Sequence, residues 1–163
     1  MRHAMTRRDW LLTGAAAFAG VAAGDAPAAQ PAAKSSGLRL GLVTYNLAKD
    51  WDLPTIIKNC QTTGFASVEL RTTHAHGVEP SLSKAQRAET RRRFDDSPVE
   101  LFGLGTTCEF QSPDPATVRK NIAMCGEFID LAADVGAKAV KVRPNGLPAG
   151  VAVEKTLEQI GAA

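Results

Sequence analysis

Cysteine is scarce in this sequence of 163 residues, and the three present, Cys60, Cys108 and Cys125, are widely spaced and form no CxxC pair. This spacing argues against a disulfide framework and a thiolate zinc site, and it predicts buried free thiols. The formal net charge is only +2, so the charge balance favours neither nucleic acid nor an anionic membrane as a partner. The hydrophobic content of 44% and the length are those of one small globular domain.

Two nucleotide-binding motifs are also missing. No Gly-x-Gly-x-x-Gly follows the first expected strand and no Gly-x-x-x-x-Gly-Lys occurs, so a dinucleotide fold and a P-loop are both disfavoured. The arginine-rich stretch Arg87–Arg93 contains no aromatic residue, which favours a solvated helix face over a phosphate or nucleic-acid site.

Residues 1–28 have the layout of a secretory signal. Three arginines precede an apolar run from Leu11 to Ala23, and Ala26-Pro27-Ala28 offers a cleavage site between small residues. The run is shorter than the ~20 residues of a membrane-spanning helix. We therefore expect an exported, periplasmic chain with no membrane span after cleavage, and residues 29–37 as a flexible leader. An uncleaved anchor is the alternative.

The segment Thr6-Arg7-Arg8-Asp9-Trp10-Leu11 resembles the twin-arginine export signal, with Trp10 where that signal usually has phenylalanine. The resemblance implies export in the folded state. An ordinary cationic signal is the alternative.

Strand-like and helical segments alternate four times between Leu38 and Ala163, which predicts an α/β fold with a parallel sheet. The expected strands are Leu38–Leu47, a second that follows Gly64, Val99–Phe110 with close packing or a bulge at Gly103 and Gly105, and Ala137–Arg143. Helices are expected from Asp52 to Gly64, from Ser83 to Asp95, from Asp114 to Gly136, and over Val153–Ile160. A buried stripe of Val118, Ile122, Cys125, Ile129 and Ala132 is expected on the third helix.

The stretch Val68–Pro80 is the richest in chemistry. Alternation along a strand places Glu69, Arg71 and Thr73 on one face, and the chain then runs into His74 and His76. Polar side chains at the C-terminal end of such a strand indicate a ligand site there.

Three segments resemble the xylose-isomerase-like TIM-barrel superfamily: Thr44-Tyr45-Asn46, the Gly-Phe-x-x-Val-Glu-Leu element from Gly64 to Leu70, and Lys141-Val142-Arg143-Pro144. That superfamily holds sugar isomerases and epimerases, hydroxypyruvate-isomerase-like proteins and endonuclease IV-type nucleases. The resemblance covers residues 38–160 and implies the N-terminal half of the barrel, about four of eight (β/α) units, with residues 38–163 as one domain.

The resemblance implies metal-assisted proton transfer beside the carbonyl of a sugar or sugar-like substrate in the complete family domain. The family's metal ligands come from later strands, so we expect a truncated, inactive chain that binds no divalent metal tightly. The alternatives are a non-catalytic carbohydrate-binding or inert fragment, and, less favoured, an endonuclease IV-like phosphodiesterase. The nuclease is disfavoured because the third and fourth strands end in Glu109 and Arg143, where its zinc cluster uses histidines.

Five residues are the candidates for substrate binding: Glu69, His74, His76, Glu109 and Arg143. No catalytic residue and no metal ligand is assigned. For Glu69 the alternative is an ion pair with Lys141 or Arg143, and for Arg143 a structural salt bridge. The two loop histidines have solvent exposure as their alternative, and a His-x-His pair also suits a metal.

A half barrel leaves two strand edges without partners, at Leu38–Leu47 and Ala139–Arg143. We therefore expect the mature chain to form a homodimer or to be poorly soluble.

Overall fold

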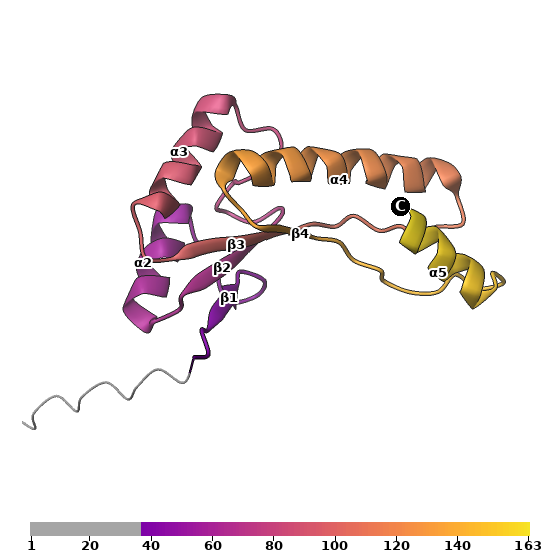
Figure 1. Cartoon of the computed structure of the whole chain (residues 1–163), viewed down its shortest axis with the longest axis horizontal. Coiled ribbons are helices and arrows are strands. Elements are labelled where there is room, and N and C mark those ends of the chain that lie inside the picture. The colour runs from indigo at the N-terminus through magenta and orange to yellow at the C-terminus, as the bar shows by residue number, and fades with distance from the viewer. Residues whose placement is uncertain (1–36) are drawn as a thin grey trace, which may run out of the picture. The chain divides into compact units, whose positions relative to one another are not determined.

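The computed structural model describes residues 37–163, and the expected signal peptide lies outside them. The unit from Leu38 to Ala163 alternates strands and helices throughout (Figure 1). The strands are β1 (Gly41–Val43), β2 (Ser67–Arg71), β3 (Glu100–Gly105) and β4 (Ala139–Lys141). The helices are α2 (Leu53–Thr63), α3 (Lys84–Asp95), α4 (Pro115–Val135) and α5 (Val153–Ala162).

The four strands form one parallel sheet in the order β1-β2-β3-β4, so each strand pairs with its neighbours in sequence. Consecutive parallel strands joined by helices are the repeating unit of a (β/α) barrel. The predicted fold class, a parallel α/β arrangement with four such units, is confirmed.

The helix boundaries follow the capping signals in the sequence. The Asp52 carboxylate accepts a hydrogen bond of 2.9 Å from the backbone N–H of Thr55, and Gly64 ends α2 in the left-handed region with φ of 78°. Ser83 and Gln86 form a complete capping box at the start of α3. These three predictions are confirmed.

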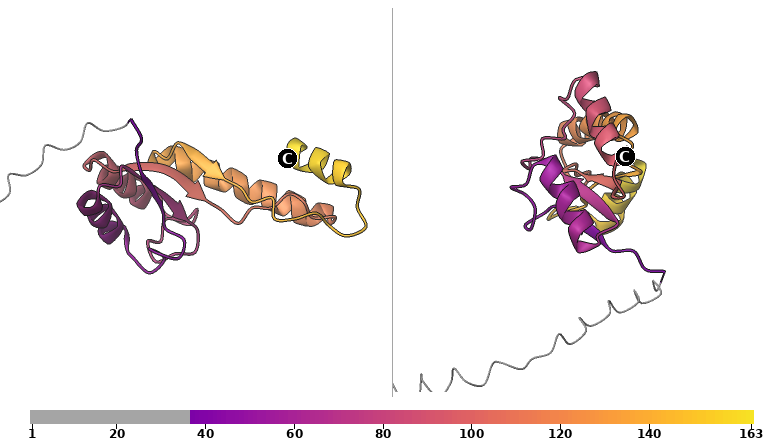
Figure 2. Two further views of the ribbon diagram at one scale, coloured as in Figure 1. Left: turned by 90° about the horizontal axis from the view of Figure 1, so that it is seen from below. Right: turned by 90° about the vertical axis from the view of Figure 1, so that its left-hand side faces the viewer.

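The hydrophobic core lies between one face of the sheet and the helices. Val68 and Leu70 on β2 alternate with half-buried polar residues and are at most 1% exposed. They belong to one cluster with Ile56 of α2 and Leu131 of α4. Burying such an aliphatic side chain stabilises the fold by about 1.5–3 kcal/mol. Helices α3 and α4 pack against each other on this side, as Figures 1 and 2 show.

Three strands are shorter than predicted, because loops begin where threonine side chains replace strand pairing. The Thr44 hydroxyl accepts a hydrogen bond from the Arg71 backbone N–H just beyond β1. The Thr106 hydroxyl, just beyond β3, accepts one from the Cys108 N–H and donates one to the Lys141 carbonyl. The predicted strands to Leu47, Phe110 and Arg143 were therefore too long.

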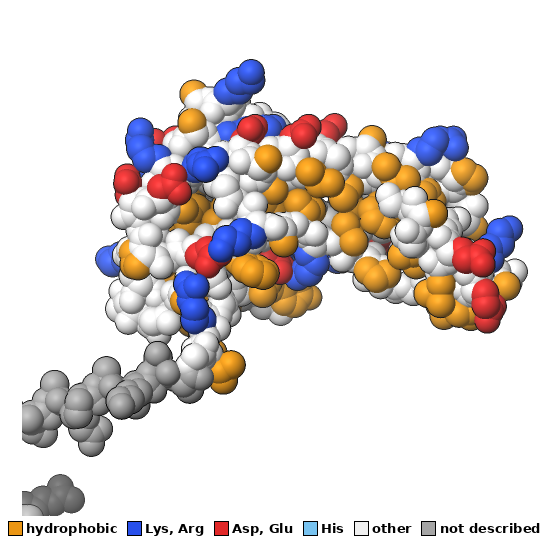
Figure 3. Space-filling view, viewed as in Figure 1, with side chains coloured by type: hydrophobic (Ala, Val, Ile, Leu, Met, Phe, Trp, Pro, Cys, Tyr) orange, Lys and Arg blue, Asp and Glu red, His pale blue; other side chains and the backbone are white. Residues whose placement is uncertain are grey.

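Of the predicted buried stripe of α4, Ala132 is buried, Val118 and Cys125 are half-buried, and Ile122 and Ile129 are exposed. The structure instead buries Phe128, Leu131, Ala132 and Val135, while Ile129 is 55% exposed. Only the C-terminal turns of α4 reach the sheet, and within them Ile129 faces an open hollow beside Val140 of the edge strand β4. The space-filling view in Figure 3 shows apolar side chains gathered along α4 and beneath it.

The structure also tests the prediction for the cysteines. Cys60 and Cys108 are buried free thiols, as predicted, and Cys125 is partly buried. Within residues 37–163, no helix is both long and apolar enough to cross a membrane.

Candidate functional site

The candidate site lies on the sheet face opposite the packed helices. The strand register aligns its side chains in two rows across the sheet: Val43, Glu69, Gly103 and Ala139, then Arg71, Gly105 and Lys141. The register shifts between Val68 and Glu69, so Phe102 is an extra residue on β3. This bulge places two glycines opposite Glu69 and Arg71, and the predicted close packing at Gly103 and Gly105 is confirmed.

Glu69, in the first row, forms an ion pair diagonally across the sheet with Lys141, in the second row. The Glu69 side chain is only 15% exposed, whereas that of Lys141 is 49% exposed. A Cβ added at Gly105 would lie 2.7 Å from Glu69 Oε1, so the carboxylate occupies the space above the glycine. Of the two alternatives for Glu69, a ligand contact or an ion pair, the ion pair with Lys141 is present.

Arg71 and Tyr45 form the other half of this surface. The guanidinium carbon of Arg71 lies 4.5 Å from the centre of the Tyr45 ring, which is a cation–π contact. Val43, Tyr45, Arg71, Lys141 and Arg143 together line an open hollow of about 400 Å³. Thr73, expected on the same face, instead lies in the following turn with φ of 66°.

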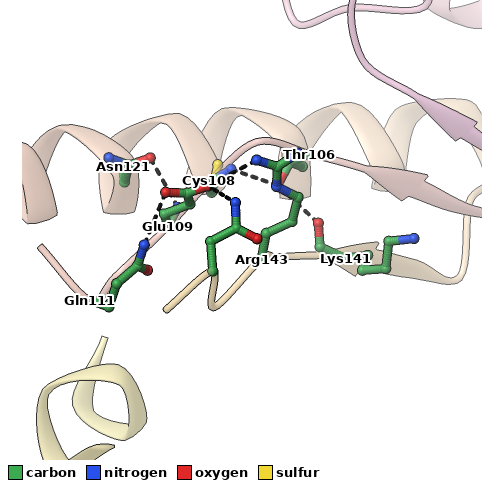
Figure 4. Close-up of polar contacts among 8 residues, drawn as sticks. Thr106, Cys108, Glu109, Gln111, Asn121, Lys141 and Arg143 are labelled. Atoms are coloured by element: carbon green, nitrogen blue, oxygen red, sulfur yellow. Dashed lines mark hydrogen bonds and ion pairs between the residues drawn. The ribbon is translucent and has the colours of Figure 1, made fainter. Parts of the chain in front are cut away.

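Glu109 organises the loops that follow β3 and β4 (Figure 4). Its carboxylate accepts hydrogen bonds from Arg143 at 2.9 Å, Gln111 at 3.0 Å and Asn145 at 2.5 Å. The bonds from Arg143 and Gln111 hold the pKa of the Glu109 carboxyl below its usual range. Glu109 is therefore ionised near neutral pH, and it orients Arg143 toward the hollow's edge.

His74 and His76 lie in the loop after β2, and neither lines the hollow. His74 Nδ1 lies 2.9 Å from the Thr44 hydroxyl, and burial together with the positive charge of Arg71 lowers the pKa of its imidazole. His76 is buried and uses both ring nitrogens. Its Nδ1 accepts a hydrogen bond from the Val78 N–H, so Nε2 carries the proton and donates to the Arg71 carbonyl at 2.8 Å.

The structure thus joins Glu69 to the hollow through Lys141, and Glu109 to Arg143. A direct role in substrate binding stays a prediction for all five candidates. Sequence analysis placed Arg71 on the face of the expected ligand site, but it included neither Arg71 nor Tyr45 among the five candidates. A signal was present, since each follows a residue of the same face, Glu69 and Val43, by the two-residue spacing of a strand.

Comparison with known proteins finds relatives only among solved structures; no family model and no curated sequence matches. The IolI protein with a bound zinc atom matches at a TM-score of 0.62 and 14% identity, covering 75% of this chain and 43% of IolI. D-Psicose 3-epimerase in the presence of D-fructose matches at 0.58 and 17% identity, with coverages of 77% and 47%. The probable 3-DHS dehydratase AsbF from Bacillus anthracis matches at 0.50 and 17%, with coverages of 64% and 38%.

The chain has a partial TIM-barrel fold. It spans less than half the length of each of these structures, and identities this low establish the fold alone. The predicted superfamily resemblance is confirmed at the level of the fold.

A divalent metal is expected for the complete family domain, and a zinc atom is bound in IolI. Residues 37–163 contain no group of three or more histidine, cysteine, aspartate or glutamate side chains placed to hold a metal ion. His76 has both nitrogens engaged within the loop, and Glu69 and Glu109 face cations. The described residues do not fit a metal centre, and we assign no metal-dependent step to them.

Proposed function

We propose that residues 38–163 form the substrate-binding part of an isomerase- or epimerase-type TIM barrel that acts on a small sugar-like molecule. The observation that carries this proposal is the set of polar side chains around the hollow at the C-terminal ends of the strands: Tyr45, Arg71, Lys141 and Arg143. That end of the strands is where TIM-barrel enzymes place their active sites. The fold shared with D-psicose 3-epimerase supports a sugar as ligand.

Three of these side chains, Lys141, Arg143 and Tyr45, have a direct chemical task in binding a neutral sugar. Lys141 and Arg143 donate hydrogen bonds and suit the hydroxyl and carbonyl oxygens of a sugar. Tyr45 presents an aromatic surface that is half exposed. Glu69 and Glu109 hold the two cations in place, because each carboxylate already faces one of them.

Sugar binding is measured on the full 163-residue chain through backbone amide NMR shifts during titration with D-fructose and D-psicose. Saturable shifts are expected at the C-terminal ends of β1–β4. Lys141→Met should weaken binding by about tenfold, the effect of losing one charge-assisted hydrogen bond. Lys138→Met is the matched control, since Lys138 pairs with Glu100 at the opposite end of the sheet. Absence of saturable binding, or equal effects of the two variants, would contradict the proposal.

A second candidate function is carbohydrate binding without catalysis. The observation that favours it is the hydrogen bonding of Glu109, which lowers the pKa of its carboxyl and makes it a weak general base near neutral pH. Conversion of D-psicose by the purified chain, followed by chromatography with and without added divalent metal, separates the two. Binding without conversion favours this second function, whereas conversion favours the first.

We further propose that the chain acts after export to the periplasm. The support is the arrangement of residues 1–28, in which paired arginines precede a short apolar run.

A further inference from the structure

Arg71 differs from the other cations of the hollow in its partners. Lys141 faces Glu69 and Arg143 faces Glu109, whereas Arg71 has no carboxylate within 4.0 Å in the part of the chain that the structure describes. Its guanidinium instead lies against the Tyr45 ring. A cation–π contact occupies the face of a guanidinium and leaves its N–H groups able to donate in the plane.

The backbone of Arg71 is held on both sides. Its N–H donates to the Thr44 hydroxyl at 3.0 Å, and its carbonyl accepts from His76 Nε2 at 2.8 Å. Thr44 is fully buried and His76 is 9% exposed, so both anchors are inside the fold. A side chain that starts from a fixed backbone and rests on an aromatic ring is pre-organised for a ligand.

The charged side chains around the hollow carry a net charge of +1. Arg71, Lys141 and Arg143 contribute three positive charges, and Glu69 and Glu109 contribute two negative charges that pair with the last two cations. The unmatched positive charge belongs to Arg71.

We infer that the hollow binds a sugar acid, a sugar-like molecule carrying one carboxylate, and that Arg71 receives this carboxylate. The inference rests on the proposed function and narrows its substrate class. A single carboxylate balances the single excess charge, and its two oxygens match the paired N–H groups of a guanidinium. A phosphate monoester carries nearly two negative charges near neutral pH, so it would leave one charge unmatched beside Glu69. His76 and Thr44 act as positioning residues for Arg71.

Three ligands that differ only at one carbon test this inference: D-fructose, D-fructuronate and D-fructose 6-phosphate. Each is titrated into the full chain, with dissociation constants taken from amide NMR shifts. D-Fructuronate should bind roughly tenfold or more tightly than D-fructose, and more tightly than the phosphate. Arg71→Met should abolish this preference, so that the variant binds D-fructuronate no more tightly than D-fructose. Lys138→Met should retain the preference.

A salt titration provides a second measurement that needs no variant. The affinity for D-fructuronate should fall as sodium chloride rises, whereas that for D-fructose should not. Equal binding of fructose and fructuronate, or a fructuronate preference insensitive to salt, overturns the inference and leaves the proposed sugar site standing. Tighter binding of the phosphate overturns the assignment of a carboxylate. Failure of all three ligands to bind overturns both the inference and the proposed function.

Discussion

The carboxylate of Glu69 on β2 reaches across β3 to pair with the ammonium group of Lys141 on β4. The strand between them, β3, carries Gly105 directly beside Lys141. Any larger residue at this position would fill the space that the carboxylate occupies. The ion pair therefore depends on a glycine to which neither partner is adjacent in sequence. The bulge at Phe102 sets this register, so the geometry of the site begins in the backbone of β3.

Alanine substitutions at the two glycines of β3 should have unequal effects on stability. A Cβ at Gly105 would meet side-chain atoms, Glu69 Oε1 at 2.7 Å and Arg71 Cγ at 3.0 Å. These atoms can move, so Gly105→Ala should cost about 1 kcal/mol of unfolding free energy and displace Glu69 from Lys141. A Cβ at Gly103 would meet the Ala139 carbonyl oxygen at 3.1 Å, and backbone yields less. Gly103→Ala should therefore cost more, about 2–3 kcal/mol.

Urea unfolding of the variants measures this order. Gly126→Ala in α4 is the control, because a Cβ there meets nothing within 4 Å and alanine favours a helix by about 0.5–1 kcal/mol. Equal losses of unfolding free energy in the two variants would contradict this order, and would show that the β4 backbone shifts as readily as the side chains near Gly105.

His76 should make stability depend on pH in the mildly acidic range. Burial is the main cause that lowers the pKa of its imidazole, although the hydrogen bond to the Arg71 carbonyl opposes it. The unfolded chain therefore binds the proton more readily than the folded chain. Stability is complete above the unfolded pKa of about 6.5 and is lost as pH falls through the interval below it. Urea unfolding between about pH 7.5 and about pH 5 should show this decline.

His76→Gln removes the titrating group and should flatten that decline, while costing about 1–3 kcal/mol at neutral pH through lost buried hydrogen bonds. The alternative of solvent exposure is wrong for His76, because the structure buries it. His74→Gln is the companion variant, since the pKa of His74 is also lowered but the residue is only partly buried. An unchanged pH slope in His76→Gln would assign the decline to other groups.

Local signals in the sequence predicted the helices well and the site less well. Helix caps form hydrogen bonds between residues that are close in sequence, so they can be predicted from the sequence alone. This holds for Asp52, Gly64 and the Ser83–Gln86 capping box. The α4 stripe failed because burial depends on the elements that cover each side of the helix, and the side with Ile129 faces an open hollow beside the edge strand β4. The stacking of Arg71 on Tyr45 joins β2 to the turn after β1, and neither segment alone contains the register that aligns them. Sequence spacing showed which residues lie on the same face of a strand, but it did not show which side chains from different strands are in contact.

Export by the twin-arginine route is tested by replacing Arg7 and Arg8 with lysine. The double variant should remain in the cytoplasm, because lysines keep the positive charge but not the paired guanidinium groups. Cell fractionation followed by immunoblotting measures the distribution. Normal export of the double variant would instead support an ordinary cationic signal.

The open strand edges should make the chain associate with itself. In the sheet formed by residues 38–163, β1 and β4 each pair on one side only, and Leu40 beside β1 is 67% exposed. Unpaired backbone groups next to apolar side chains are a template for another strand. Sedimentation velocity over a range of concentrations should reveal a dimer or larger species. Leu40→Lys should weaken this association, because a charge at an edge opposes pairing. Leu157→Lys changes an equally apolar exposed residue on α5, away from both edges, and should leave association unchanged. A wild-type chain that stays monomeric at every concentration, with a sharp unfolding transition, would show that the edges are protected by other means.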